Sequence, residues 1–258
     1  MDGKRDFEFI NYSSAKHVAR ITLTRPPLNV IHIKMLGEIE SALEQAAEEK
    51  ALKVLILAAK GKLFSAGVDV AEHTPELVDQ MIPLFNRVCA AIANFPLPTI
   101  AAIQGHALGG GCEFVICCDH AIMVENARIG QPEIKLASLA PIAALRLPLI
   151  VGPRWTARML FSGEPIEAHT AARIGLVDRH TSAEAFAKAV DELVDPLLSM
   201  SAAALRHNKA AYLLGMGAWM ERITAMEKLY LDDLMRTDDA KEGLRAFLEK
   251  RDPKWKNS

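Results

Sequence analysis

The spacing of apolar residues changes along the chain between short continuous runs and helical periods, which predicts an alternation of strands and helices. Apolar residues gather in Phe7–Tyr12 and Val18–Thr24, on either side of Ser13 and Ser14, which predicts an opening antiparallel hairpin with its turn at the two serines. The runs Val54–Ala59 and Thr99–Ile103 are short and wholly or largely apolar, as is typical of strands buried inside a sheet.

Helices are predicted where apolar residues recur at three- and four-residue steps. This period runs through His32–Glu49 and again through Glu76–Phe95, where Pro96 and Pro98 end the second helix. Strands and helices alternate in units of about forty residues, which indicates an α/β protein. By this pattern alone a doubly wound parallel sheet is a candidate fold, although the glycines of residues 105–111 lack the GxGxxG spacing of a dinucleotide-binding turn.

The second half of the chain is predicted to be mainly helical, with one short strand at Leu176-Val177. The predicted helices are Pro153–Phe161, Ala168–Ile174, Ala183–Leu198, Ala202–Leu214, Trp219–Met235 and Asp239–Lys250. An apolar stripe at helical spacing consists of Met216, Met220, Met226, Leu229 and Leu234. We interpret this stripe as packing in the core or between subunits, because that role is commoner than a cofactor pocket.

Composition narrows the class of protein. With 258 residues, of which 50% are hydrophobic, the chain is long enough for a sizeable core. Its 30 basic and 32 acidic residues give a net charge of -2, which provides no broad cationic field for nucleic acid or an anionic membrane. The charged start MDGKRDFEFI does not read as a secretory signal, and no apolar run is long enough to span a membrane.

Cysteine and histidine usage predicts a reduced, metal-free protein. The four cysteines have neither CxxC spacing nor histidine partners arranged for zinc, so they are interpreted as buried thiols of a cytoplasmic protein: Cys89, Cys112, Cys117 and Cys118. No two histidines form an HExxH pair. His106 lies in a glycine-rich turn, where a structural role is favoured over catalysis.

The candidate chemistry is concentrated in residues 98–133. The strand Thr99–Ile103 leads to four glycines within residues 105–111, directly before the helical run Cys112–Cys118. Glycine lets the backbone approach a ligand closely, and the first N–H groups of a helix have no partner inside it. Such groups can point at a developing negative charge, so the segment has the features of an oxyanion hole.

Two glutamates accompany this segment. Glu113 falls in the first turn of the helix, and Glu133 follows a Gly-Gln-Pro turn twenty residues later. Either could be an ordinary acid near a helix N-terminus, where the helix dipole favours negative charge. As a pair they suit the hydration of an activated alkene, in which one carboxylate takes a proton from water and another, protonated carboxyl group delivers one to carbon.

The string AAIQGHALGGGCEFVICCD, followed by ARIGQPEI, resembles the signature of the crotonase superfamily of enoyl-CoA hydratases and isomerases. KGKLFSAGVDV, RPPLNVI and the ending TDDAKEGLRAFLEKRDPKW are also similar to that family. The resemblance implies a spiral of repeated ββα units over residues 1–201, with the active site, and a C-terminal helical oligomerisation module over residues 202–258. It also implies a homotrimer or a dimer of trimers.

The resemblance assigns roles to individual residues. It implies that the backbone N–H groups of Val68 and Gly110 form the oxyanion hole and that Glu113 and Glu133 are catalytic. The expected contacts to the CoA part of the substrate are Ala66 and Lys250, although Lys250 could equally be a solvated lysine. CoA is part of the acyl-CoA substrate, and no metal or separate cofactor is expected. Asp69 is expected to support its loop rather than to react.

One segment departs from the common pattern. After Glu133, many family members carry a glycine-rich loop, whereas this chain reads KLASLAPIAALRLP. We expect the replacement to reshape the acyl pocket through Ala137, Leu139, Pro141, Ile142 and Leu145. The combined segments look similar to the cyclohexa-1,5-diene-1-carbonyl-CoA hydratases of anaerobic aromatic degradation. The alternatives are a general enoyl-CoA hydratase or isomerase of fatty-acid oxidation and, less favoured, a non-catalytic RNA-binding or scaffold protein.

Overall fold

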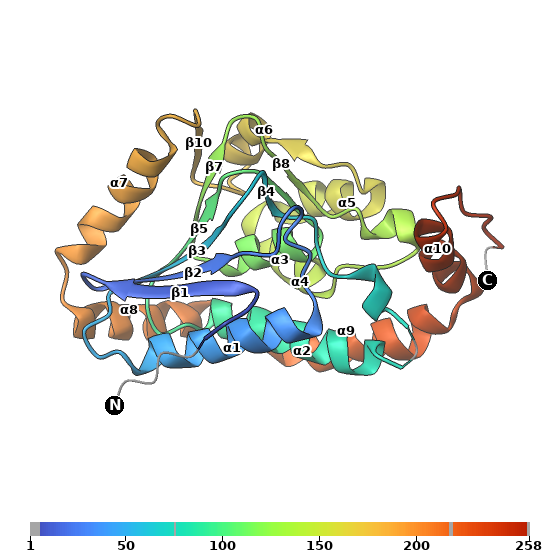
Figure 1. Cartoon of the computed structure of the whole chain (residues 1–258), viewed down its shortest axis with the longest axis horizontal. Coiled ribbons are helices and arrows are strands. Elements are labelled where there is room, and N and C mark those ends of the chain that lie inside the picture. The colour runs from blue at the N-terminus through green and yellow to red at the C-terminus, as the bar shows by residue number, and fades with distance from the viewer. Residues whose placement is uncertain (1–5, 75, 217–218, 257–258) are drawn as a thin grey trace.

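The computed structural model describes residues 6–74, 76–216 and 219–256, and its larger sheet has six strands in the order β1-β2-β3-β5-β7-β10 (Figure 1). Strand β1 pairs antiparallel with β2, and the four strands after β2 continue in parallel. Their bounds are β1 Ile10–Ala15, β2 Val18–Leu23, β3 Val54–Ala59, β5 Thr99–Ile103, β7 His120–Val124 and β10 Arg179–Thr181. The predicted opening hairpin and both predicted buried strands are therefore present.

A smaller sheet of four strands accompanies the first. Its order is β4-β6-β8-β9, with bounds β4 Leu63–Ser65, β6 His106–Leu108, β8 Arg128–Gly130 and β9 Ile166–Glu167. Along the chain, each of β3, β5 and β7 in the large sheet is followed by a strand of the small sheet and then by a helix. This repeated ββα turn is the predicted spiral, and it excludes the doubly wound sheet as the fold.

Helices cover both faces of the large sheet. The chain up to residue 173 contains the helices α1 Ile33–Glu48, α2 Val78–Ala93, α3 Gly110–Cys117, α4 Pro141–Ile150, α5 Gly152–Ser162 and α6 Ala168–Arg173. Helix α7, Phe186–Leu198, lies on the other face, where Val190 and Val194 pack against Ile56, Ile100 and Ile122 (Figure 1). Because both faces are covered, β3 and β5 are apolar at nearly every position.

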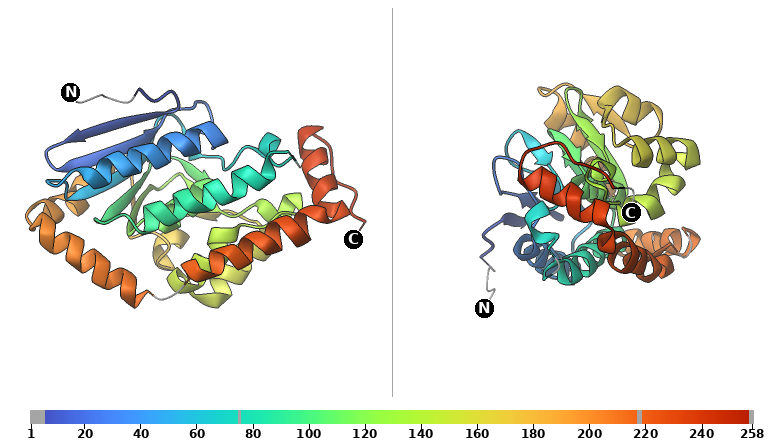
Figure 2. Two further views of the ribbon diagram at one scale, coloured as in Figure 1. Left: turned by 90° about the horizontal axis from the view of Figure 1, so that it is seen from below. Right: turned by 90° about the vertical axis from the view of Figure 1, so that its right-hand side faces the viewer.

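The C-terminal region is helical, as predicted. It contains α8 Ala202–Gly215, α9 Ile223–Lys228 and α10 Asp238–Leu248, and α10 lies at one end of the molecule beside the C-terminus (Figure 2). The helix expected over Trp219–Met235 is present as a continuous helical run, whose hydrogen bonding changes from a 3-10 turn to α9, then to the π-helical segment Leu229–Asp233 and to a second 3-10 turn. The division of the chain at residue 202 stays a prediction.

Two local predictions were wrong. The hairpin turn lies at Lys16 and His17, whose positive φ angles of 51° and 68° close a two-residue loop between the paired Ala15 and Val18. The strand expected at Leu176-Val177 comes later, as β10, because the N–H groups of both residues bond to the Ala171 carbonyl of α6 and not to a strand. The segment after Glu133, for which no helix or strand was predicted, contains helix α4, which begins with Pro141 in its first turn.

Candidate active site

Two glycine-containing segments meet at the carboxyl ends of β4 and β6. A Cβ atom on Gly67 would lie 3.2 Å from the Leu108 carbonyl oxygen, and one on Gly110 would lie 2.9 Å from Cγ1 of Val68. A side chain at either glycine would therefore press on the neighbouring segment. Glycine at these positions lets the turn after β4 lie directly against the start of α3.

The backbone N–H groups of Val68 and Gly110 are both available to a ligand. Ile31 donates its N–H to the Gly67 carbonyl and accepts from the Asp69 N–H, both at 2.8 Å. In this parallel bridge the N–H of Val68 points away from Ile31. Gly110 is the first residue of α3, so its N–H has no acceptor within the helix. Neither N–H donates to another group in the described part of the chain.

Glu113 lies in the first turn of α3 and is only 3% exposed. Its Oε1 atom accepts hydrogen bonds from the backbone N–H groups of Ile142 and Ala143, both at 2.9 Å. These two donors belong to the N-terminal turn of α4, so the segment that differs from the family's glycine-rich loop holds the carboxylate. Burial raises the pKa of Glu113 above its usual value, although the two hydrogen bonds oppose that effect.

Glu133 begins the short 3-10 helix Glu133–Leu136 and is partly buried. Burial, and next the negative charge of Glu113, raise the pKa of Glu133 above its usual value. Gln131 is 1% exposed, and with its amide nitrogen turned toward Glu133 it donates to the two carboxylate oxygens at 3.1 and 3.2 Å. The two predicted glutamates are linked through Gly109: a Cβ atom there would lie 2.7 Å from Oε1 of Glu133, and the Glu113 N–H donates to the Gly109 carbonyl at 3.0 Å.

Two cavities adjoin Glu133, and Glu113 lines neither of them. The first, of about 330 Å³, contains the predicted residues Ala66, Val68 and Glu133, together with Gly67, Val70, His73, Gly109, Pro132, Lys135, Leu136, Ser138, Leu244 and Phe247. The second, of about 220 Å³, is lined by Gln131, Glu133, Ile134, Ser138, Leu139, Ala140, Ala144, Leu160, Phe161, Met226 and Leu229. Glu133 and Ser138 line both cavities, so they mark the place where the two adjoin.

The remaining predicted residues divide into two groups. Ala66 lines the first cavity and donates its N–H to the Leu28 carbonyl at 2.9 Å. Asp69 supports its own loop, as expected, by accepting from the Ala71 N–H and pairing with Arg25 at 3.4 Å. Lys250 is exposed, follows α10 and lines neither cavity of its own chain. Its role toward CoA stays a prediction.

Sequence reasoning missed several residues of the site. Ser138 and Tyr230 form a buried hydrogen bond of 2.8 Å between their hydroxyl groups, and nothing in their sequence spacing connects them. Met226 and Leu229, which were assigned to packing, line the second cavity. Of the five residues expected to form a new acyl wall, Leu139 lines this cavity, whereas Ile142 faces the core and holds Glu113 through its backbone.

Two other predictions concern residues outside the cavities. His106 accepts a hydrogen bond from the Arg128 N–H through Nδ1, at 2.9 Å, so its role is structural, as predicted. All four cysteines are free and buried, as predicted. The part of the chain that the structure describes contains no cluster of three or more His, Cys, Asp or Glu side chains that could hold a metal ion. Among the same residues, no helix is long and apolar enough to cross a membrane.

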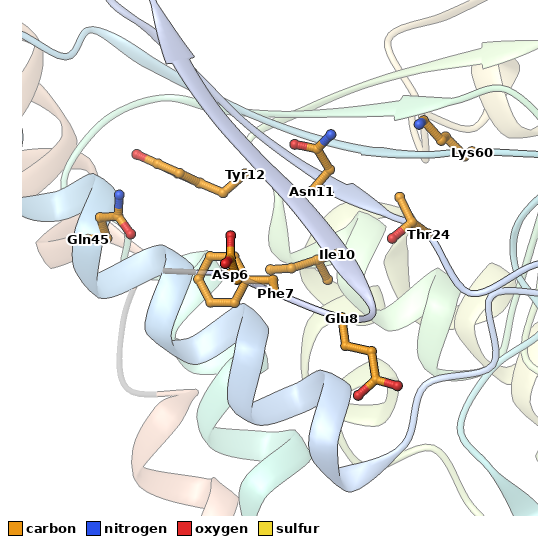
Figure 3. Close-up of a pocket in the computed structure, with 9 residues that line it drawn as sticks. All are labelled: Asp6, Phe7, Glu8, Ile10, Asn11, Tyr12, Thr24, Gln45 and Lys60. Carbon is orange, nitrogen blue, oxygen red and sulfur yellow. The ribbon is translucent and has the colours of Figure 1, made fainter. Parts of the chain in front are cut away.

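A further hollow of about 370 Å³ lies between the opening hairpin and α1 (Figure 3). Its lining includes Asp6, Glu8, Tyr12, Gln45 and Lys60, and the side chains come from the hairpin, α1 and the end of β3. Neither glycine segment and neither of the paired glutamates lines it. Its size alone therefore does not make it a candidate for the same chemistry.

The spiral of ββα turns, with two glycine segments, the buried Glu113 and the partly buried Glu133, has the architecture of crotonase-fold enzymes. The sequence model of the enoyl-CoA hydratase/isomerase family matches residues 13–258, and the chain belongs to this family. Its relatives are named as hydratases, which are hydro-lyases, and the protein is an enzyme of this class.

Two relatives have the same level of identity. A cyclohexa-1,5-dienecarbonyl-CoA hydratase from Thauera aromatica is 34% identical over 239 residues, which are 92% of this chain and 92% of that protein. A crotonyl-CoA hydratase from Syntrophomonas wolfei is 34% identical over 251 residues, covering 95% of this chain and 96% of that one. The crystal structure of an enoyl-CoA hydratase from Mycobacterium avium subsp. paratuberculosis K-10 matches with a TM-score of 0.85 and 27% identity, over 97% of this chain and 99% of that chain.

Proposed function

We propose that the protein adds water to a conjugated enoyl- or dienoyl-CoA thioester and that cyclohexa-1,5-diene-1-carbonyl-CoA is its preferred substrate. The observation that carries this proposal is that Glu113 and Glu133 both lie against Gly109, beside the two segments that contain Val68 and Gly110. Addition of water to such a thioester needs a base, an acid and donors to the thioester oxygen, and the pair and the two N–H groups supply all of them.

In the proposed reaction, the thioester oxygen accepts hydrogen bonds from the N–H groups of Val68 and Gly110. Glu113 removes a proton from water as the water oxygen bonds to the remote carbon of the conjugated system. The electrons of the double bond move to the thioester oxygen and form an enolate. Glu133 then delivers its proton to carbon, which for a simple enoyl thioester is the α-carbon, and the carbonyl re-forms. The result is one added molecule of water.

The environments of the two glutamates favour this division of roles. Glu113 accepts hydrogen bonds from two backbone N–H groups at the N-terminus of α4, and these bonds stabilise its charged form. Glu133 bears the added repulsion of Glu113, which favours its protonated form. At a pH between the pKa values of the two glutamates, Glu113 is therefore the base and Glu133 is the acid.

The two backbone donors lower the barrier by stabilising the enolate oxygen. Removing one oxyanion donor from an enzyme typically raises the activation free energy by about 2.7–4 kcal/mol.

The second cavity supports a compact, apolar acyl group. Leu139, Leu160, Phe161, Met226 and Leu229 supply its apolar walls, and Glu133 is at its junction with the first cavity. A rigid ring fills such a space with little ordering cost, whereas a short linear chain leaves part of the wall uncovered. One or two missing methylene contacts typically lose about 1–3 kcal/mol of discrimination. The relative from Thauera aromatica is named for such a ring substrate.

The CoA part of the substrate is proposed to extend through the first cavity along Ala66, with Lys250 contributing from a neighbouring subunit. We further propose a homotrimer or a dimer of trimers, in keeping with apolar residues exposed in the C-terminal region, among them Leu214, Phe247 and Leu248. No metal or separate cofactor takes part in the proposed reaction, because the thioester oxygen is stabilised by backbone donors alone.

The proposal is tested by comparing kcat/KM for cyclohexa-1,5-diene-1-carbonyl-CoA and crotonyl-CoA under one set of conditions, with products identified by mass and NMR. We expect a clear preference for the ring ester. A preference for crotonyl-CoA would refute the ring assignment and leave the hydratase assignment intact. That outcome would favour a general enoyl-CoA hydratase, which the equally identical relative from Syntrophomonas wolfei also represents.

A further inference from the structure

A buried pair of hydroxyl groups lies at the junction of the two cavities. Ser138 and Tyr230 are 7% and 1% exposed, and their oxygens are 2.8 Å apart. Ser138 lines both cavities together with Glu133. The pair therefore adjoins one of the two proposed proton-transfer groups, and no step of the reaction described above uses it.

The Ser138 hydroxyl is held in a fixed relation to Glu133. The Ser138 N–H donates to the Glu133 carbonyl at 3.1 Å, and Ala137 between them has a left-handed φ of 52°. These features close one tight turn that carries both side chains. Tyr230 approaches from the π-helical segment Leu229–Asp233, and such local departures from the α-helix are frequent at functional sites.

The direction of the hydrogen bond follows from burial. Each hydroxyl group has one hydrogen, and one of the two is used between the pair. If Ser138 donated, the hydrogen of Tyr230 would be buried without an acceptor in the described part of the chain, which is costly. Tyr230 therefore donates to Ser138, and the hydrogen of Ser138 is free to point into the shared part of the cavities. Burial, and next the negative charges of Glu133 and Glu113, raise the pKa of Tyr230, so its phenol keeps its hydrogen and remains a donor.

We propose that Ser138, oriented by Tyr230, donates a hydrogen bond to the oxygen that is added to the substrate. Tyr230 is then a positioning residue, and Ser138 is a second contact to that oxygen, beside Glu113. This inference rests on the proposed hydratase function. The thioester oxygen is occupied by the backbone donors, so the oxygen of the adding water is the remaining polar atom at the reacting centre.

The test separates water addition from proton transfer at carbon. A site that stabilises the enolate and holds an acid–base group should exchange the α-protons of a saturated acyl-CoA, such as butyryl-CoA, for solvent deuterium. This exchange breaks and re-forms only a carbon–hydrogen bond, so it needs no adding water. Ser138→Ala, Tyr230→Phe and the double variant are compared with wild type for both reactions, and Tyr212→Phe, at an exposed tyrosine of α8, is the matched control.

We expect each single variant to lower kcat for hydration about tenfold, the effect of losing one neutral hydrogen bond, with KM changed less than about twofold. The double variant should be no worse than the poorer single variant, because the two hydroxyls act as one unit. Deuterium exchange should stay near the wild-type rate. Equal losses in both reactions, or no loss in hydration, would overturn the inference. Absence of both reactions in wild type would instead refute the proposed function.

Discussion

Gly109 offers a direct test of whether the Glu133 carboxylate must lie where the structure has it. Its backbone has φ 54° and ψ -128°, a conformation that residues other than glycine rarely adopt. A Cβ atom at this position would lie 2.7 Å from Oε1 of Glu133 and 3.6 Å from Cα of Gly67. Gly109→Ala therefore strains the backbone and also pushes the carboxylate out of its place.

The expected magnitudes follow from these distances. An ordinary contact to Cβ begins near 3.4 Å, so the carboxylate must move by several tenths of an ångström. Displacements approaching 1 Å at a reacting group can cost about 10²-fold in rate. The backbone strain costs roughly 1–3 kcal/mol, which lowers the melting temperature by about 2–4 °C for each kcal/mol in a chain of this size. We therefore expect kcat to fall by about ten- to a hundredfold.

The assay is steady-state hydration of the acyl-CoA, with the melting temperature measured in parallel. Gly175→Ala is the matched control, because its φ of 78° strains the backbone in a similar way while nothing lies within 4 Å of its Cβ position. Gly37→Ala, where nothing lies within 4 Å, reports the effect of the substitution alone. A Gly109→Ala enzyme that melts lower but keeps the wild-type kcat would refute the need for this carboxylate position.

Three further predictions concern pH, metal and assembly. The rate should be greatest between about pH 7 and about pH 8, because Glu113 is protonated below its pKa of about 7 and Glu133 loses its proton above its pKa of about 8. Glu113→Gln should abolish the fall in rate on the acidic side of the pH profile, and Glu133→Gln should abolish the fall on the alkaline side. Each variant should lower kcat about 10²–10⁴-fold. An unchanged pH profile in either variant would remove that glutamate from the assignment. A chelator should leave turnover unchanged, and loss of activity that only an added metal restores would contradict the proposed chemistry. Light scattering should give a trimer or a hexamer, and a stable monomer at micromolar concentration would contradict both the assembly and the sharing of the CoA site.

Much of the fold could be predicted from local pattern. Buried strands such as Val54–Ala59 and Thr99–Ile103 are covered on both faces, so their continuous apolar runs identify them. The predicted helix over His32–Glu49 differs little from α1, because its apolar stripe has a clear period and His32 caps its first turn. The spiral itself came from the family resemblance, since strand spacing alone also fitted a doubly wound sheet.

The errors have physical causes that local pattern does not contain. The serines of the hairpin remained in the strand because the positive φ angles at Lys16 and His17 closed the turn instead. Leu176 and Val177 are apolar because they complete the core after α6, a role that resembles a buried strand in sequence.

Some residues of the candidate site could likewise be predicted from the sequence, and others could not. Glu113 and Glu133 could be found because both lie within recognisable motifs, and their coupling is consistent with that prediction. The donors that hold Glu113 could not be found, because the backbone N–H groups of Ile142 and Ala143 leave no trace in residue type. The Ser138–Tyr230 pair joins residues that are far apart in the chain, so only the folded structure reveals it.

The central claim is that the paired glutamates add water to a conjugated CoA thioester. It is tested most directly by incubating the wild-type enzyme with the ring dienoyl-CoA in water labelled with heavy oxygen and measuring the mass of the product. We predict a product heavier by one molecule of labelled water, formed far more slowly by the double variant Glu113→Gln, Glu133→Gln. A ring product without the label, or equal labelling by the double variant, would contradict the account.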